Sequence, residues 1–414
     1  MTSQESLFQN KPVLLAMILL FAFGTFVRIY PSAGFKGIGF DENLYQMNVA
    51  RLKQVGVLYF PEIVQAHIDK QTKMEMAILP PTRFLYVFLA YLWSSLFSME
   101  PWPALRAISC LFSIFLLALS TLFAWRLGGQ NYGLAVLALM SAAPTQIHMS
   151  QHALIDGFFA FWALLTVWLL WENLHRENHP GWLLVYAASI AAMVLTKENS
   201  FFVFISVLGL LAATHLLKYG TVTRNLLIAT FAGAAFGFVF LVALSGGVKP
   251  FVETYRLLVV KAEQLPYAIQ TGDGPWYRYL VDYLLMSPVV LLLAIGTIFS
   301  LRRDDSPSWY LVLFVVFSYI IMTNVKNGMN LRYTNMWDMP LRFLAATQLF
   351  AVSERLSRTF HRSPQFVAIL LFAALCTLEL RQYSIFFVKN DLYELVTMEL
   401  MRPINIVKPR NAAH

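Results

Sequence analysis

The chain has 414 residues, of which 58% are hydrophobic and only 13% are charged. Soluble domains carry about a quarter charged residues, so this composition indicates a protein embedded in lipid and excludes a soluble enzyme, a disordered protein and a nucleic-acid binder. The formal net charge of +8 fits cytoplasmic loops rich in Lys and Arg. Cys110 and Cys376 lie in apolar stretches and predict neither a disulfide framework nor a metal–thiolate site.

Twelve apolar runs are candidates for spanning helices, which need roughly 20 mostly apolar residues. In chain order they are 12–30, 79–98, 103–125, 131–148, 157–172, 181–196, 200–217, 225–245, 283–301, 308–323, 337–354 and 364–387. The first run has no small-x-small cleavage site and further runs follow it. It is therefore interpreted as an uncleaved helix and not as a signal peptide.

The positions of the basic residues indicate that run 79–98 does not cross the membrane. It opens with Pro80 and Pro81 and is rich in aromatic residues, which suits a helix on the outer membrane face. With the N-terminus in the cytoplasm, this choice puts most basic loop residues inside, as the orientation rule requires. They are Arg126, Arg176, Lys218, Arg224, Arg302, Arg303, Arg355, Arg358 and Arg362. If run 79–98 crossed, all of them would move outside.

We therefore predict an all-α polytopic membrane protein with about 11 transmembrane helices. Residues 1–387 form one module, and 388–414 form a short C-terminal tail outside the membrane. Two extracytoplasmic loops are long, 31–102 and 247–282, and long loops in compact folds are usually functional. The two halves show no symmetry in hydropathy, which weighs against an inverted-repeat transporter.

The first long loop contains an acidic pair, Asp41-Glu42, in a stretch that ends at Tyr45. A carboxylate held at the membrane surface can have a raised pKa and act as a base. The second carboxylate of such a pair is better placed as a metal ligand or hydrogen-bond partner. The structural alternative is that Asp41 caps a helix that runs to Lys53.

Asp156 lies in the predicted outer turn between the third and fourth spans. It either caps the following helix or is functional, because an acidic group at the membrane boundary is costly unless it is paired. Asp156 and Asp41 fall on the same predicted side of the membrane. His148 and His152 flank this turn, and such histidines are more often hydrogen-bonded structural residues than ligands.

Two further outer turns carry cations. Lys197 and Glu198 lie between spans five and six, where Lys197 either binds a phosphate or extends to the interface in an ion-paired turn. Arg332-Tyr333 precedes span ten, and an outside cation is disfavoured there. A bound phosphate would explain Arg332, because a guanidinium group fits phosphate oxygens; the alternatives are a pair with Asp338 or lipid headgroups.

Acidic and basic residues thus converge on one membrane face, as a site for a lipid phosphate and a polar acceptor requires. At these residues the sequence resembles the GT-C superfold of integral membrane glycosyltransferases. It is most similar to the branch of dolichyl-phosphate-mannose protein mannosyltransferases and bacterial lipid A aminoarabinose transferases, which is glycosyltransferase family 39-like. The resemblance covers residues 12–350 and rests on Asp41-Glu42, Pro80-Pro81, the stretch 144–157, Thr196-Lys197-Glu198 and Arg332-Tyr333.

The resemblance implies an inverting glycosyltransferase of the bacterial inner membrane, with its active site facing the periplasm. It would move a sugar from a polyprenyl-phosphate donor to a protein, lipid or glycan acceptor, and its long first loop would form juxtamembrane helices. Asp41 would deprotonate or orient the acceptor, with support from Glu42 and Asp156. The implied substrate- and phosphate-binding residues are Lys197, Glu198, Arg332, Tyr333, Tyr45 and Arg83.

Several alternatives stay open at this point. Asp41 and Asp156 are candidate ligands for Mg²⁺ or Mn²⁺, although no spacing demands a metal. The chain has Ile78-Leu79 before the double proline, where the aminoarabinose transferases tend to have Glu-Lys, so lipid A is not favoured as the acceptor. The other function classes are a transporter or flippase for a lipid-linked glycan and a non-catalytic subunit of a glycosyltransferase complex.

Overall fold

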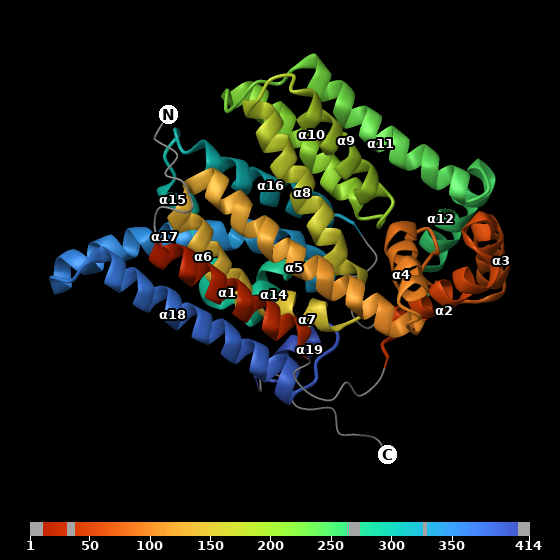
Figure 1. Cartoon of the computed structure of the whole chain (residues 1–414), viewed down its shortest axis with the longest axis horizontal. Helices are drawn as coiled ribbons and strands as arrows, with labels where there is room; N and C mark the ends of the chain where they lie inside the picture. Colours follow the sequence, from red (N-terminus) through yellow and green to blue (C-terminus); the bar gives the residue numbers. More distant parts are fainter. Residues whose placement is uncertain (1–10, 31–37, 263, 265–273, 326–328, 405–414) are drawn as a thin grey trace.

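The computed structural model describes residues 11–30, 38–262, 264, 274–325 and 329–404, and every regular element in these ranges is a helix (Figure 1). The first half contains α1 (Lys11–Ile29), α2 (Phe40–Val55), η1 (Val57–Tyr59), α3 (Phe60–Lys73), α4 (Phe84–Leu96), α5 (Pro101–Gly128), α6 (Gln130–Ser141), α7 (Pro144–Gln151), α8 (Ile155–His175) and α9 (Pro180–Val194). The second half contains α10 (Ser200–Leu217), α11 (Arg224–Leu244), α12 (Val248–Ala262), α14 (Arg278–Met286), α15 (Pro288–Ser300), α16 (Ser306–Thr323), η2 (Leu331–Trp337), α17 (Asp338–Phe360), α18 (Pro364–Tyr383), η3 (Ser384–Lys389) and α19 (Thr397–Met401).

Seven of the described helices are long and apolar enough to cross a membrane: α1, α5, α8, α10, α11, α16 and α18 with its continuation η3. The shorter α9, the polar α17 and the broken pairs α6–α7 and α14–α15 lie in the same bundle (Figure 1). Pro144 and Pro288 start the second helix of each pair, because proline cannot continue the hydrogen bonds of the first. The arrangement is compatible with the predicted 11 crossings.

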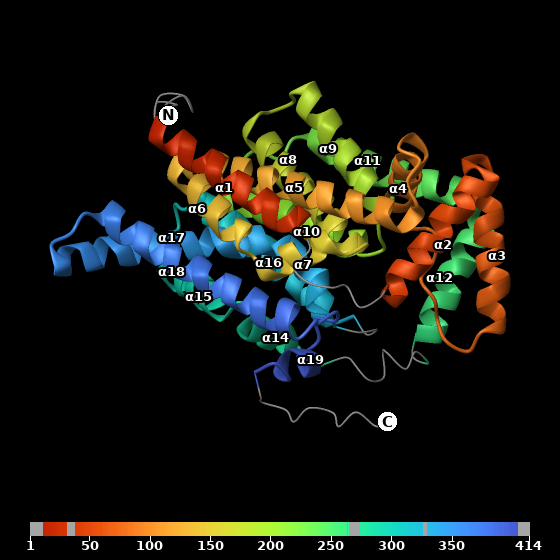
Figure 2. The ribbon, with the colours of Figure 1, turned by 60° about the horizontal axis from the view of Figure 1, so that its bottom comes forward.

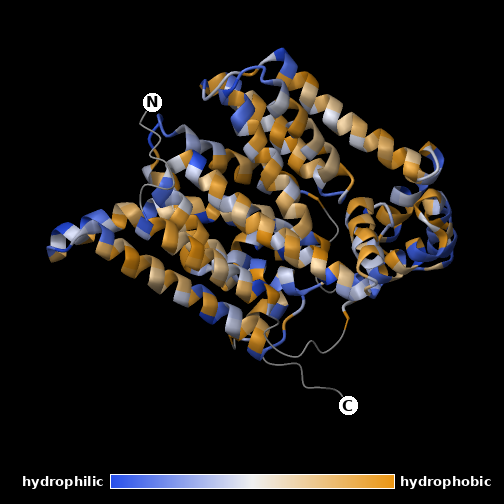
Figure 3. Cartoon of the chain, in the orientation of Figure 1, coloured by the Kyte–Doolittle hydropathy of each residue, from blue (hydrophilic) through white to orange (hydrophobic). Residues whose placement is uncertain are grey.

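Hydrophobic residues dominate the helices of the bundle, and hydrophilic residues gather at helix ends and connections (Figure 3). Leu216, Phe236 and Phe299 are 77%, 67% and 87% exposed. A surface of this kind is stable against lipid and not against water. The chain is therefore an integral membrane protein, as predicted.

The first long loop forms a separate group of helices. Within run 79–98, α4 has 13 residues and a length of about 20 Å, whereas a bilayer core is about 30 Å thick. Helix α4 packs against α2 and α5, and α2, α3, α4 and α12 lie together at one end of the bundle (Figures 1 and 2). An apolar cluster separate from the main core of the bundle joins this group to the bundle, and it includes Tyr45, Phe84 and Phe158. The expected juxtamembrane helices are thus present.

A buried ion network lies beneath η2 in the bundle. Arg342 Nη1 donates to Asp338 Oδ1 at 2.7 Å, and Arg342 Nη2 donates to Glu379 Oε2 at 2.6 Å. Asp338 also accepts hydrogen bonds from Thr145 and Gln146, at 2.7 and 2.6 Å. The network therefore joins α7, α17 and α18 at the level where η2 ends.

Replacing Arg342 with Met should destabilise the protein strongly, because two buried carboxylates would lose their cation. The expected loss is about 3–5 kcal/mol in the free energy of unfolding. Thermal unfolding in detergent measures it, with the exposed Arg358→Met on the same helix as the matched control. An unchanged melting temperature for Arg342→Met would show that the network contributes little to stability.

Candidate active site

Four segments at one end of the bundle bring the predicted charged residues together: the start of α2, the α7–α8 turn, the α9–α10 turn and η2. Arg332 Nη2 lies 2.6 Å from Asp41 Oδ2, and Arg332 Nε lies 3.6 Å from Asp156 Oδ2. Lys197 Nζ lies 2.6 Å from the other oxygen of Asp156. Asp41 is 17% exposed and the other three side chains are at most 4% exposed. The residues form one continuous row of alternating charge.

A second ion pair continues this row on the side of α4. Arg83 Nε donates to Glu198 Oε2 at 3.1 Å, Arg83 Nη2 donates to Glu198 Oε1, and Arg83 Nη1 donates to the Tyr45 hydroxyl. The Lys197 ammonium lies 4.3 Å from the centre of the Tyr333 ring, a cation–π contact. Arg83, Tyr45, Glu198 and Tyr333 therefore lie next to the charged row, in contact with one another or with Lys197.

Glu42 is also part of this region, but it is fully buried and faces the backbone. Its carboxylate accepts from the Gly39 N–H at 2.7 Å and the Ala153 N–H at 2.5 Å, and it lies 3.5 Å from His152 Nδ1. Burial alone would raise the pKa of Glu42, but His152 and the two N–H groups outweigh it, and the net pKa is lowered. Glu42 thus joins the start of α2 to the α7–α8 turn and fixes the position of Asp41.

The contacts correct several structural alternatives predicted from the sequence. Asp41 does not cap its helix: Gly39 is the N-cap, and its N–H donates to the Glu42 side chain at 2.7 Å. The N-cap of α8 is the residue before Ile155, so Asp156 lies in the first turn and pairs with a cation instead. Lys197 is buried and does not extend to the interface. The partner of Arg332 is Asp41, because Asp338 pairs with the interior network.

Pairing outweighs burial in setting the pKa of Glu198 and Arg332, which lie outside the spanning helices. For Lys197, burial outweighs the pairing with Asp156, and the net pKa is lowered. Burial would raise the pKa of Glu198, but the Arg83 guanidinium and then Lys197 hold it below its usual range. Burial would lower the pKa of Arg332, but Glu394 and Asp41 raise it well above its usual value. Burial raises the pKa of Tyr333 to about 12, so this hydroxyl is neutral.

The carboxylates Asp41 and Asp156 do not fit a metal site in this arrangement. The Arg332 guanidinium lies between them, where a shared cation would have to sit, and Lys197 takes the other oxygen of Asp156. Over the described ranges, no three His, Cys, Asp or Glu side chains are grouped closely enough to hold a metal ion. The negative charge is balanced by side-chain cations.

The predicted C-terminal tail contributes site residues that its sequence does not reveal. Glu394 Oε1 lies 3.8 Å from Arg332 Nη1, and Glu394 Oε2 accepts from Asn330 Nδ2 at 2.7 Å. Tyr393 lies beside it, with its ring centre 5.1 Å from that of His152. This polar stretch has no motif or apolar pattern that would have indicated a site.

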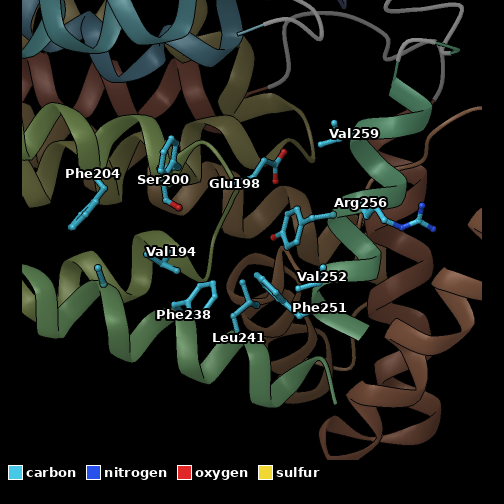
Figure 4. Close-up of a pocket in the computed structure, with 13 residues that line it drawn as sticks. Val194, Glu198, Ser200, Phe204, Phe238, Leu241, Phe251, Val252, Arg256 and Val259 are labelled. Carbon is cyan, nitrogen blue, oxygen red and sulfur yellow. The ribbon is translucent and has the colours of Figure 1, made fainter. Parts of the chain in front are cut away.

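An apolar pocket of about 630 Å³ lies next to the charged row, and Glu198 is among its lining residues (Figure 4). Glu198, which pairs with Arg83, lies at its polar end. Tyr255 also lines it and accepts a hydrogen bond from Thr82 at 3.0 Å. The other lining residues, from α9, α10, α11, α12 and the α9–α10 turn, are Val194, Ser200, Phe201, Phe204, Ala234, Phe238, Leu241, Phe251, Val252, Arg256 and Val259.

Comparison with known sequences gives one family. Residues 57–254, slightly less than half of the chain, match the family model described as dolichyl-phosphate-mannose-protein mannosyltransferase. No curated protein sequence matches the chain. The family match covers the first long loop from η1 onward, Asp156, Lys197, Glu198 and the pocket residues up to Val252.

Solved structures with the same fold cover almost the whole chain. The apo oligosaccharyltransferase of Archaeoglobus fulgidus is 14% identical with a TM-score of 0.61, over 92% of this chain and 57% of that one. ArnT of Cupriavidus metallidurans in the apo state is 13% identical with a TM-score of 0.53, over 95% of this chain and 74% of that one. ArnT bound to undecaprenyl phosphate is 14% identical with a TM-score of 0.51, over 96% and 75%.

These matches establish the fold class. The chain has the GT-C fold, and the predicted resemblance to the mannosyltransferase family is confirmed over residues 57–254. The chain spans little more than half the length of the archaeal oligosaccharyltransferase.

Proposed function

We propose that this protein is an inverting glycosyltransferase that moves a sugar from a polyprenyl-phosphate donor to a polar acceptor. The observation that carries the proposal is the junction of an apolar pocket with a buried row of cations and carboxylates at Glu198. A polyprenyl-phosphate sugar has the matching parts: an apolar chain, an anionic phosphate and a polar sugar. The structure of ArnT with bound undecaprenyl phosphate supports this class of donor.

Lys197 and Arg332 are the proposed ligands of the donor phosphate. Both are buried in the row and paired with carboxylates, Lys197 next to the pocket residue Glu198 and Arg332 on the other side of Asp156. A phosphate would compete with Asp41 for Arg332, because both anions use the same guanidinium donors. Donor binding would therefore weaken the hold of Arg332 on Asp41.

Asp41 is the proposed base. It would accept the proton of an acceptor O–H or N–H as that atom attacks C1 of the sugar from the face opposite the phosphate. The new bond to C1 forms as the C1–O bond to phosphate breaks, and polyprenyl phosphate leaves with the electron pair of that bond. Arg332 and Lys197 would stabilise the negative charge that develops on the leaving group.

The reaction should not need a divalent cation, because side-chain cations already stand where the metal would act. Transfer rates of purified protein with and without EDTA measure this, and we expect no change. Recovery of activity only upon adding Mg²⁺ or Mn²⁺ would restore Asp41 and Asp156 as candidate metal ligands.

The proposed orientation places the site outside the cytoplasm. Helix α8 carries Asp156 at one end and meets the loop of Glu177 at the other, while Glu75 lies in the first long loop. Both glutamates are exposed. In a chain without Cys110 and Cys376, a membrane-impermeant maleimide should label Glu75→Cys in intact cells and Glu177→Cys only after lysis. The reverse pattern would contradict the orientation.

Mass spectrometry of glycolipids and glycoproteins from a deletion strain tests the function itself. Loss of one glycosylated product, restored by the intact gene, is expected. Purified protein should form the same product from a polyprenyl-phosphate sugar. Accumulation of a lipid-linked sugar without transfer by the purified protein would favour a transporter, and transfer only within a complex would favour an accessory subunit.

A further inference from the structure

The segment 392–397 is fixed against the charged row. The Leu331 N–H donates to the Leu395 carbonyl at 2.9 Å, which joins the segment to η2 next to Arg332. The Thr397 hydroxyl donates to Asp282 Oδ1 at 2.6 Å and so attaches the segment to α14. Leu395 is fully buried. The segment is therefore a wall of the site and not a free tail.

The hydroxyl of Tyr393 lies buried in this wall and has no hydrogen-bond partner among the described residues. It approaches Gly39 closely, since a Cβ atom added there would lie 2.1 Å from the hydroxyl. Gly39 begins the helix that carries Asp41. Leaving a buried hydroxyl without a partner costs free energy, so a ligand that hydrogen-bonds to this atom would be stabilised by it.

Tyr393 lies at the opposite end of the charged row from the apolar pocket. The pocket begins at Glu198, and the contacts then lead through Lys197 and Asp156 to Arg332. Tyr393 and Glu394 follow beyond Arg332. If the donor occupies the pocket end, this wall faces the acceptor.

Two partly exposed side chains that pair with Arg332 beside this wall, Asp41 and Glu394, are negative. The cation Arg278 donates to Thr397 at 3.1 Å, at the last residue of the segment. Asp41 and Glu394 are 17% and 24% exposed, whereas the Arg332 side chain between them is only 4% exposed. An incoming acceptor therefore meets two carboxylates before it meets Arg332. A phosphate-bearing group would be repelled there, and a neutral hydroxyl or a cationic amine would not.

We propose that Tyr393 and Glu394 form the acceptor subsite. The Tyr393 hydroxyl hydrogen-bonds a polar group of the acceptor, and Glu394 together with Asp41 selects a neutral or cationic group over a phosphate. This inference rests on the proposed function and adds the acceptor class to it.

The test is Tyr393→Phe, which removes only the hydroxyl. The melting temperature should be unchanged or higher, because no protein partner is lost. Affinity for undecaprenyl phosphate, measured with purified protein in nanodiscs, should match the wild type. Product in the complemented deletion strain should fall by about tenfold. Full product formation, or a fall in melting temperature that accounts for the loss, would overturn the proposal.

Tyr186→Phe is the matched control. The Tyr186 hydroxyl is buried in the bundle and lies 3.1 Å from Thr230 Oγ1, and neither residue is among the side chains of the charged row or the pocket. This variant should lose stability and keep its specific activity, the opposite pattern to Tyr393→Phe.

The product itself gives the second measurement. The glycosylated atom, identified by tandem mass spectrometry, should belong to a hydroxyl or an amine. A sugar attached to a phosphate would overturn the selection by charge while leaving the transferase proposal intact. If the deletion strain loses no glycosylated product and undecaprenyl phosphate does not bind, the proposed function fails as well.

Discussion

Replacing Asp41 with Asn should reduce sugar transfer by about 10²–10⁴-fold, the range that a general base contributes. The amide keeps the shape of the side chain and cannot take a proton from the acceptor. Binding of undecaprenyl phosphate should be unchanged or tighter. Asp41 Oδ2 lies 2.6 Å from Arg332 Nη2, and the substitution removes this competitor for the phosphate. Initial transfer rates and binding titrations in nanodiscs measure the two effects separately.

Asp69→Asn is the matched control for this change. Asp69 is an exposed carboxylate on α3, in the same juxtamembrane group, and only Gln65 bonds to it in the described structure. Its replacement should leave transfer and binding unchanged. If Asp41→Asn transfers sugar at the wild-type rate, Asp41 is not the base.

The core of the site could be predicted because charge is costly at a membrane boundary. Asp41, Asp156, Lys197 and Arg332 stand out in a chain with only 13% charged residues, and the orientation rule put them on one side. Which acid meets which cation could not be predicted, because the four residues come from separate turns. The pairing of Arg332 with Asp41 depends on how η2 lies against α2.

Four buried or site residues were not predicted from the sequence. For two of them the sequence contains no indication, and for the other two it contains one that was not used. Tyr393 and Glu394 lie in a polar stretch. Charged and aromatic residues are common in such a stretch, so they do not indicate a functional site there. Arg342 and Glu379, in contrast, interrupt the apolar runs 337–354 and 364–387. A charge inside such a run needs a buried partner, so both residues could have been predicted to belong to a buried ion network.

The second large effect is expected at Arg332, which contacts three carboxylates. Arg332→Ala should abolish measurable transfer and weaken undecaprenyl phosphate binding by at least about tenfold, the value of one charge-assisted contact. It should also cost about 3–5 kcal/mol of stability, because Asp41, Asp156 and Glu394 would be left with one cation fewer. Thermal unfolding and binding titrations on the same samples measure both.

A loss of stability alone could explain a dead Arg332→Ala variant, so the double variant Arg332→Ala with Asp41→Asn is decisive. Removing a cation and its nearest anion together restores the charge balance, and part of the lost stability should return. Phosphate affinity should stay low, because the guanidinium is still absent. A double variant that regains wild-type affinity for undecaprenyl phosphate would show that Arg332 only holds the site together, and Lys197 would then be the phosphate ligand to examine.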